Sequence, residues 1–571
     1  MDKTMGKKEI TLEEIRNFKG KYPKQLWYLA LVEMWERFTF YGMRALLALY
    51  IAHLALSADY KPLSQEEIET KKTEYQTKFH QDLTEQHPKF YLETSQQKWK
   101  DEAESKSNKQ YGLIQAFIYA MAFAGGMFAD RLFGFRKSVF WGGILMAVGT
   151  FTMAIPGAFT FYLGISILIV GNGFFKPNIS TMVGALYKQD DPRRDAGFSV
   201  FYMAINVGAL LSGAMIGYIG TAISWSLGFA LSGICMLLGL GVFHFTQKKL
   251  GPIGLAPDVE KLKQKTLGIS KDWLYHIGTL LFIPFFLLMI YYPVDVNVTW
   301  LLGEVINADG TKGANYVQFS DVFMITIAVV VLIYLTVLLF KVSKEEFGKM
   351  LVAIILILFC ALFFSFFEQG GGSLNFFAAG NVDGHGLNMT QINNSVNSLW
   401  VIIFAPILGV LWIALSKKNR EPNTIVKFGL GFVFLGLGFL VFYLSRALAT
   451  SDGFTPLWTF VLAYLVISVG ELCLSPIGLS MITQLTPVRL HGMMMGTWFL
   501  ATAYGQYGAG LIGSMLAKVD TSIENPTNMD KLIQYTDGYQ SIAYIAVGAG
   551  IVLLIISPFL NRVMSRKQVR I

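Results

Sequence analysis

The chain has 571 residues, of which 53% are hydrophobic and only 15% carry a charged side chain. Together with a mean hydropathy of +0.46, this composition indicates an integral membrane protein and excludes an ordinary soluble domain. The formal net charge of +8 does not indicate nucleic-acid binding, because the basic residues lie mostly in short loops between apolar segments. All three cysteines lie inside apolar segments, so no disulfide framework is predicted.

The apolar segments predict an all-α membrane protein with about fourteen spans, since a spanning helix needs about 20 residues. They are arranged as six, two and six. The first six lie near residues 25–53, 110–129, 137–155, 159–186, 198–220 and 225–245. The next two lie near 273–292 and 322–340, and the last six near 349–377, 395–415, 425–444, 456–485, 493–516 and 541–559. We therefore expect an N-terminal six-helix bundle (1–246), a linker with two extra helices (247–346) and a C-terminal six-helix bundle (347–571).

The distribution of lysine and arginine predicts the orientation. Basic residues gather in alternate short loops and at both ends of the chain, so both termini are expected in the cytoplasm. The N-terminal segment has no cleavable signal pattern, and the first span is expected to act as the insertion signal. One extracytoplasmic connection, residues 58–108, is long, polar and almost neutral in charge. Its composition favours helix, and one possible arrangement is a helical hairpin that faces outward. We favour a solvated segment without a binding role over a cap that binds a partner.

Ionisable side chains in the middle of the first span are the strongest functional signal. A charge at the centre of a bilayer costs about 2.5–3.5 kcal/mol on insertion scales, so such groups mark function by default. Glu33, Glu36, Arg37, Tyr41 and Arg44 recur at helical spacing, which places them along one side of a helix. This stripe predicts a wet cavity, and an ion-paired stripe that only joins helices is the less favoured interpretation.

Further polar side chains lie deep in later spans. Lys176 precedes Pro177, which kinks the helix. The main interpretation of Lys176 is a cationic site for a substrate carboxylate, and the alternative is a structural ion pair. Glu368 lies beside a glycine run, and Glu471 lies one turn before Pro476.

A census of the deep charges indicates how protons are carried. The acids and the bases are Glu33, Glu36, Glu368 and Glu471 against Arg37, Arg44 and Lys176. Buried opposite charges are expected to pair, so one acid in excess suggests a proton resident on a carboxylate. Because no histidine lies in the middle of a span, carboxylates must carry any proton that moves. The sequence shows no ATP-binding loop, metal cluster or nucleophile elbow, and neither a cofactor, a metal nor enzyme activity is predicted.

Several motifs in order resemble the proton-dependent oligopeptide transporter (POT) family of the major facilitator superfamily. The first span matches the family pattern E-x-x-E-R-F-x-[FY]-Y-G-M-R-A. The motifs that carry the resemblance occupy residues 33–45, 175–178, 201–208, 367–369 and 470–476. The turn at residues 130–137 also resembles the loop between spans two and three of the superfamily. The two extra spans are similar to those of prokaryotic members.

The resemblance implies two six-helix bundles around a central cavity with alternating access. It places the substrate carboxylate on Arg37, Tyr41 and Lys176, and the peptide amino group on Asn206, Asn397 and Glu471. It also implies that Tyr119 and Trp498 line the space for substrate side chains. The expected proton-coupling positions are Glu33, Glu36, Arg37, Arg44 and Glu368. Arg44–Glu368 and Lys176–Glu471 are candidate pairs that break and reform.

The resulting hypothesis is a proton-coupled symporter of the cell (inner) membrane that imports di- and tripeptides. Its partners would be peptides, protons and the lipid bilayer, with no nucleic acid, and the monomer is the expected working unit. One alternative is a proton-coupled transporter of the same fold for an amino acid or an organic anion. Another is a transporter-derived membrane receptor that uses residues 58–108 to bind a partner. A saturable, proton-dependent flux of solute across the membrane would distinguish a transporter from a receptor.

Overall fold

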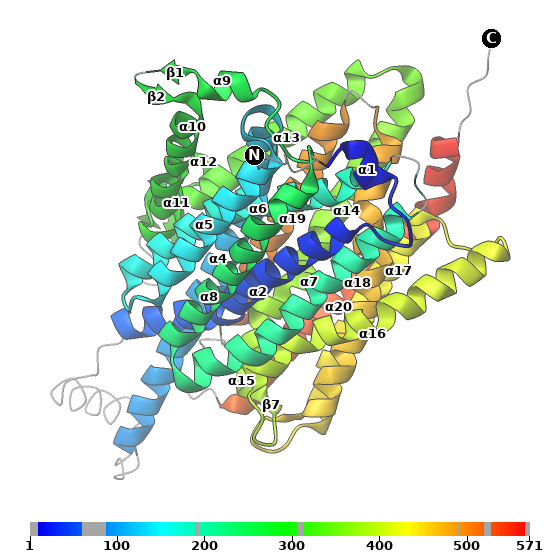
Figure 1. Cartoon of the computed structure of the whole chain (residues 1–571). Coiled ribbons are helices and arrows are strands. Elements are labelled where there is room, and N and C mark those ends of the chain that lie inside the picture. Colours follow the sequence, from blue (N-terminus) through cyan, green and yellow to red (C-terminus); the bar gives the residue numbers. More distant parts are fainter. Residues whose placement is uncertain are drawn as a thin grey trace.

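The computed structural model describes residues 10–59, 87–188, 191, 193–266, 268–306, 312–487, 490–518 and 527–565. Within these ranges long α-helices dominate, and twelve of them are long and apolar enough to cross a membrane. Figure 1 shows these helices packed against one another at various inclinations. The predicted all-α membrane fold is therefore confirmed.

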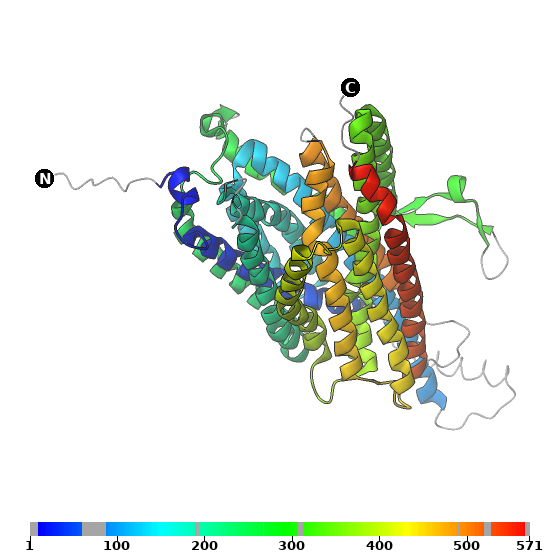
Figure 2. The ribbon, with the colours of Figure 1, turned by 90° about the vertical axis from the view of Figure 1, so that its right-hand side faces the viewer.

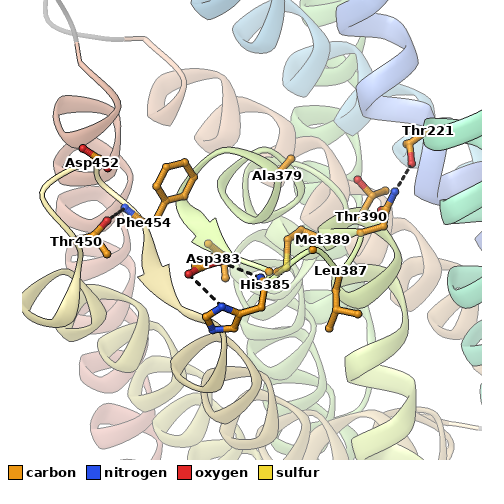
Figure 3. A pocket seen from close by; sticks show the side chains of 14 residues that line it. Thr221, Ala379, Asp383, His385, Leu387, Met389, Thr390, Thr450, Asp452 and Phe454 are labelled. Atoms are coloured by element: carbon orange, nitrogen blue, oxygen red, sulfur yellow. Dashed lines mark hydrogen bonds and ion pairs between the residues drawn. The ribbon is translucent and has the colours of Figure 1, made fainter.

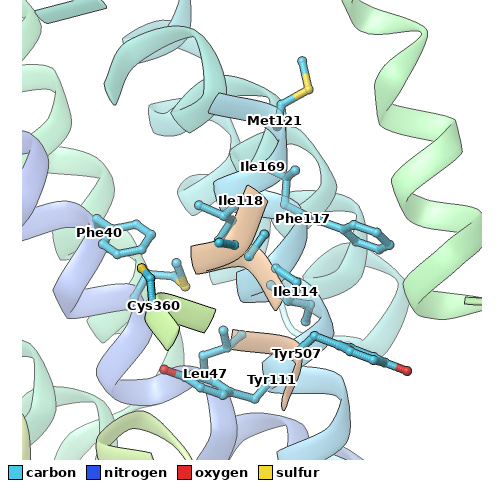
Figure 4. Close-up of a cluster of buried hydrophobic side chains, with 14 of the residues drawn as sticks. Phe40, Leu47, Tyr111, Ile114, Phe117, Ile118, Met121, Ile169, Cys360 and Tyr507 are labelled. Carbon is cyan, nitrogen blue, oxygen red and sulfur yellow. The ribbon is translucent and has the colours of Figure 1, made fainter. Parts of the chain in front are cut away.

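The N-terminal part of the chain forms the helices α1 (Leu12–Arg16), α2 (Lys24–Asp59), α4 (His87–Phe128), η1 (Ala129–Phe133), α5 (Phe135–Ala154), α6 (Ala158–Ala185), α7 (Arg194–Tyr218), η2 (Ile219–Ile223), α8 (Trp225–Thr246) and η3 (Gln247–Leu250). Of these, α5 packs along α6, and α2 packs along both α7 and α8. The buried face of α4 is apolar: Ile114, Phe117 and Ile118 lie in a cluster with Phe40 and Leu47 of α2 (Figure 4). Burial of this face fixes α4 against α2 and α6.

The middle part contains the helices α9 (Val259–Lys263), α10 (Lys271–Leu280), α11 (Phe282–Tyr291), α12 (Thr299–Leu302) and α13 (Phe319–Lys341). Its short strands pair antiparallel as β1 (Lys265–Thr266) with β2 (Ile269–Ser270), β3 (Asp295–Asn297) with β6 (Tyr316–Gln318), and β4 (Val305–Ile306) with β5 (Lys312–Gly313). Helix α13 joins both flanking parts of the chain through Asp321. Its carboxylate accepts a hydrogen bond from Tyr507 OH at 2.7 Å and pairs with Lys109 Nζ at 2.6 Å.

The C-terminal part contains α14 (Lys344–Phe367), η4 (Glu368–Gly371), α15 (Ser373–Asn381), α16 (Met389–Lys417), α17 (Thr424–Ser445), η5 (Arg446–Leu448), α18 (Leu457–Leu485), α19 (His491–Leu516) and α20 (Asn528–Ser565). The strands β7 (Val382–Asp383) and β8 (Thr455–Pro456) form a short parallel pair. Helix α17 packs between α18 and α20, while α14 packs along α19. Contacts of α19 with α4 and of α16 with α7 join the C-terminal helices to the N-terminal ones.

Each predicted span falls on a helix, but two predicted spans are divided. The span near 273–292 is split into α10 and α11, and the span near 349–377 is interrupted by η4 at Glu368–Gly371. The helices α5 and α19 are not among the twelve most apolar ones, because α5 begins with charged residues and α19 is rich in glycine. The count of fourteen spans and the division into two bundles and a linker stay predictions.

Figures 1 and 2 show where the ends of the helices lie. Helix α1, the C-terminal end of α20 and the β1–β2 hairpin lie at one end of the molecule, and the turn from α15 into β7 lies at the opposite end. This agrees with the prediction that both ends of the chain lie on the same side of the membrane. The assignment of that side to the cytoplasm remains a prediction from the lysine and arginine bias.

The predicted insertion at residues 58–108 is in part corrected. Residues 60–86 lie outside the described residues, but α4 begins at His87 and continues without a break into the second span. Asp101, Ser105 and Asn108 are buried rather than solvated. The end of the insertion is therefore part of the helix packing. The burial of these residues could not be predicted from the alternation of acids and lysines, because the partner of the acids lies more than 400 residues away in the sequence.

That partner is Lys531, which completes a charged cluster that we call the outer clamp: Asp101 and Glu104 of α4 with Lys531 and Tyr535 of α20. Lys531 Nζ lies 2.7 Å from Asp101 Oδ1 and 3.1 Å from Glu104 Oε1. Tyr535 OH donates to Glu104 Oε2 at 3.0 Å. The clamp joins an N-terminal helix to a C-terminal one at the predicted extracytoplasmic end.

We expect Lys531→Met to destabilise the protein, because it leaves two poorly solvated acids close together without their shared cation. Breaking a fully buried pair costs roughly 3–5 kcal/mol, and the partial exposure of this cluster reduces the cost to about 2 kcal/mol. Thermal unfolding of the purified protein in detergent measures the effect, with Lys531→Arg as the control that keeps the charge. A methionine variant that melts with the wild type and the arginine variant would contradict the clamp.

Candidate functional site

The acid–arginine cluster of α2 is buried and tightly paired. Arg37 Nε lies 3.1 Å from Glu33 Oε1, and Arg37 Nη2 donates to Glu36 Oε1 at 2.7 Å. Arg37 Nε also donates to Glu36 Oε2. All three side chains are almost inaccessible to solvent. Two acids surround one arginine in this cluster, and α6 contributes further polar neighbours.

Helix α6 supplies two of these neighbours. Asn172 Nδ2 donates to Glu36 Oε1 at 3.0 Å, a contact that the sequence analysis missed. Lys176 lies one turn further along α6, so both side chains face α2. The Nζ of Lys176 stacks over Tyr119 of α4, 3.8 Å from the centre of the ring. No carboxylate of a described residue lies within 4 Å of the Lys176 ammonium, so the predicted Lys176–Glu471 pair is not formed in this structure.

The structure brings Arg44 and Glu368 together across the molecule. Arg44 Nη2 of α2 pairs with Glu368 Oε2 at the start of η4. Arg44 Nε donates to Tyr111 OH of α4 at 2.7 Å. A side chain at Gly371 would collide with this tyrosine, so the glycine run after Glu368 makes room for the cluster. The pair therefore joins an N-terminal helix to the break between α14 and α15.

A second acidic group lies on the C-terminal helices. Asn397 Nδ2 of α16 donates to Glu471 Oε2 at 3.1 Å and to Ser468 Oγ at 2.9 Å, both on α18. Tyr202 of α7 interacts with Glu471 and with Asn206, and the Asn206 amide itself donates to the backbone oxygen of Tyr202 at 3.0 Å. Asn206, Asn397 and Glu471 thus form one polar group, with Tyr202 as a member that the sequence analysis did not name.

Two of the predicted positions are packed against other side chains in this structure. Trp498 is buried in the C-terminal core, where its ring lies 6.3 Å from that of Phe428, and it does not face an open space. The ring of Tyr41 contacts the ring of Phe40. The Cζ of Arg44 lies over the Tyr41 ring, 5.7 Å from its centre. The partner of Trp498 comes from another helix, α17, and leaves no signal in the local sequence, whereas both partners of Tyr41 lie on α2 itself.

A cavity of about 570 Å³ lies away from all of these residues. It opens between β7, the start of α16 and the loop before β8 (Figure 3). Asp383 and His385 face each other there at 3.3 Å, and Asn388 Nδ2 donates to Thr221 Oγ1 at 2.9 Å across the α7–α16 contact. Because none of the predicted site residues lines this cavity, it is not the candidate site.

The arrangement defines a polar interior with two poles of opposite charge. On one side lie Lys176 of α6, which has no described carboxylate partner, and Arg37 of α2, which is paired with Glu33 and Glu36; on the other side lies the acid Glu471 of α18. No described group of three or more histidine, cysteine, aspartate or glutamate side chains could hold a metal ion. Paired charges and amides inside a bundle of membrane-crossing helices are typical of membrane transporters.

Comparison with known proteins identifies the family. The model of the POT family matches residues 136–529. The chain is 31% identical to the peptide transporter YePEPT of Yersinia enterocolitica over 97% of each chain, and 29% identical to dipeptide and tripeptide permease A of Erwinia pyrifoliae over 96% of each. A solved structure of a peptide transporter POT in complex with sulfate superposes with a TM-score of 0.71 at 29% identity, covering 97% of this chain and 99% of that one. The chain belongs to the POT family, and it is a multi-pass membrane protein of a transporter family.

Proposed function

We propose that the protein is a proton-coupled symporter that imports di- and tripeptides by alternating access. The observation that carries this proposal is the pair of opposed poles in one polar interior, one with two cations and one with an acid held by amides. A peptide is a zwitterion whose two ends are separated by its backbone, and two fixed poles bind such a molecule largely independently of its side chains. The names of the Yersinia and Erwinia relatives support the same substrate class.

In the proposed binding mode, Lys176 and Arg37 hold the peptide carboxylate, with Tyr41 as an additional donor. Lys176 is suited to this role because its ammonium contacts an aromatic face and no carboxylate of the described residues. Glu471, Asn397 and Asn206 hold the amino group, since a carboxylate and amide oxygens accept its hydrogen bonds. Tyr119 and Trp498 line the space for side chains in this proposal, and Trp498 would have to change its packing to do so.

Proton coupling is proposed at Glu368 and at the acids of α2. A proton on Glu368 removes the charge that holds Arg44, which loosens the joint between α2 and η4. Glu33, Glu36 and Arg37 form the second coupling group, where neutralising one acid changes the hold on Arg37 and the electrostatic surroundings of Lys176. We also propose that the protein works as a monomer in the cell (inner) membrane, with both termini in the cytoplasm.

The test is uptake by the purified full-length protein in liposomes. An inside-negative potential and an inward proton gradient are imposed, and labelled dialanine is followed over time. Concentrative uptake that a protonophore abolishes supports the symporter, with protein-free liposomes as the control. Protein-dependent uptake of an amino acid or an organic anion without uptake of dialanine would instead identify a different substrate on the same fold. If no solute moves although the protein is folded, the transporter-derived receptor replaces the proposal.

A further inference from the structure

The contact between α4 and α19, which we call the seam, buries side-chain amides that lack hydrogen-bond partners. Gln115 of α4 and Gln506 of α19 are fully buried, and neither atom of either amide finds a partner among the described residues. Asn108 of α4 is also fully buried; its Nδ2 donates to the backbone oxygen of Glu104 at 3.0 Å, but its Oδ1 is unpaired within the same part of the chain. Unpaired amides in a protein interior are unfavourable, and ordered water is the usual partner that satisfies them.

The backbone geometry of the seam brings these amides together. A Cβ atom on Gly112 would lie 2.5 Å from Gly510 Cα and 2.7 Å from the backbone oxygen of Gln506, so the two helices touch there. The helices run in opposite directions, with Ser105 Oγ and Ser514 Oγ hydrogen-bonded at 2.8 Å nearer the outer clamp. Gln115 follows Gly112 by three residues and Gln506 precedes Gly510 by four, which places both amides at one level of the seam.

The amides belong to a polar stripe that runs along α4. Its members recur every three or four residues, as expected for one face of a helix: Glu104, Asn108, Tyr111, Gln115 and Tyr119. The stripe begins in the outer clamp and passes the Arg44–Tyr111–Glu368 cluster. It ends at Tyr119, over which Lys176 is stacked.

Both proposed coupling groups adjoin this stripe. Asn108 Oδ1 lies beside Gly372, where a Cβ would come within 2.8 Å of it, and Gly372 directly follows the η4 turn that begins with Glu368. At the other end, Lys176 stacks over Tyr119 and is one of the charges that act on Glu33, whose Oε2 is buried and has no hydrogen-bond partner among the described residues.

We propose that the seam holds a file of ordered water, bound by Asn108, Gln115 and Gln506, that carries the coupling proton between Glu368 and Glu33. The inference rests on the proposed proton-coupled function and names the route inside it. The Glu368 carboxylic acid releases its proton to the nearest water, each water accepts one proton and passes another on, and the Glu33 carboxylate takes up the last. Only O–H bonds form and break, and the charge of one proton is conserved. Amides suit this role because they bind water without titrating and therefore do not trap the proton.

The test replaces the amides with a side chain of similar length that binds water poorly: Gln115→Met and Gln506→Met. The matched control is Gln110→Met on the same helix, whose amide accepts a hydrogen bond from Tyr162 OH at 2.5 Å away from the seam. Each full-length variant is reconstituted and assayed twice with dialanine, once for uptake driven by a proton gradient and once for counterflow. Counterflow requires peptide binding and alternating access but no net movement of protons.

Both seam variants are expected to lose about tenfold or more of the proton-driven rate while counterflow stays within about twofold of wild type. Gln110→Met is expected to leave the ratio of the two rates unchanged. An equal loss in both assays would overturn the inference and assign the amides to packing, and wild-type rates in both assays would show that the seam carries no proton. A wild-type protein with counterflow but no response to the proton gradient would reject the proposed coupling itself, and this inference with it.

Discussion

Glu368→Gln is expected to abolish concentrative, proton-driven uptake of dialanine while preserving counterflow. Glutamine has nearly the shape of glutamate and still accepts a hydrogen bond from Arg44, but it cannot gain or release a proton. If protonation of Glu368 loosens the contact between α2 and η4, the proton gradient can no longer drive the transport cycle of this variant. Removing a positioned proton-transfer group costs roughly 10²–10⁴-fold in rate, and the proton-driven uptake should fall by at least about 100-fold.

The measurement compares initial rates with and without a proton gradient in liposomes that contain equal amounts of protein. Glu421→Gln serves as the control, because it removes a carboxylate in the loop between α16 and α17. A hydrogen bond from Lys427 lowers the pKa of Glu421, so this acid stays ionised over the pH range of the assay and takes no part in coupling. Wild-type proton-driven uptake by Glu368→Gln would remove Glu368 from the mechanism.

Lys176→Ala is expected to raise the KM for dialanine by about 10–100-fold, since a hydrogen bond between charged groups contributes roughly 1.5–3 kcal/mol. The Lys176 ammonium contacts the Tyr119 ring and has no described carboxylate within 4 Å, so its removal breaks no direct ion pair. The loss should therefore appear in substrate affinity and leave thermal stability close to that of wild type. Counterflow gives the KM, and unfolding in detergent gives the stability.

A change on the substrate completes this test. Dialanine with an amidated C-terminus lacks the carboxylate that Lys176 is proposed to bind. The KM of wild type for the amidated peptide should therefore be about as high as the KM of Lys176→Ala for dialanine itself. Combining the variant with the amidated peptide should add little further loss, which is the expected result when two changes remove the same interaction. Fully additive losses would place the peptide carboxylate elsewhere, and Lys176→Arg should retain part of the affinity.

The fold was largely predictable because it depends on local signals. Runs of about 20 apolar residues specify spanning helices wherever they occur, and the spacing of Glu33, Arg37 and Tyr41 shows a polar face without any knowledge of its partners. The position of Asn172 could have been found in the same way, because it lies one turn before Lys176 on the same helix.

Other features depend on contacts between distant parts of the chain. The glycine run at 370–372 indicates locally that this span can bend at Glu368, but the Tyr111 side chain that fills the space beside Gly371 comes from α4 and cannot be seen in the local sequence. Likewise, Asp101 looks solvated until Lys531 is placed beside it. The packing of Trp498 against Phe428 depends on the neighbouring helix α17 and is equally invisible to a search for motifs.

The short turn η4 has a mechanical consequence. Because it separates α14 from α15, the outer part of this membrane-crossing segment can swing about the glycines at 370–372 while α14 stays upright against α19. In the proposed alternating-access cycle, opening the outer end would then move only the nine helical residues Ser373–Asn381 and not the complete membrane-crossing segment. Glu368 is the first residue of η4, so the acid that we propose to change its charge lies at the interruption itself.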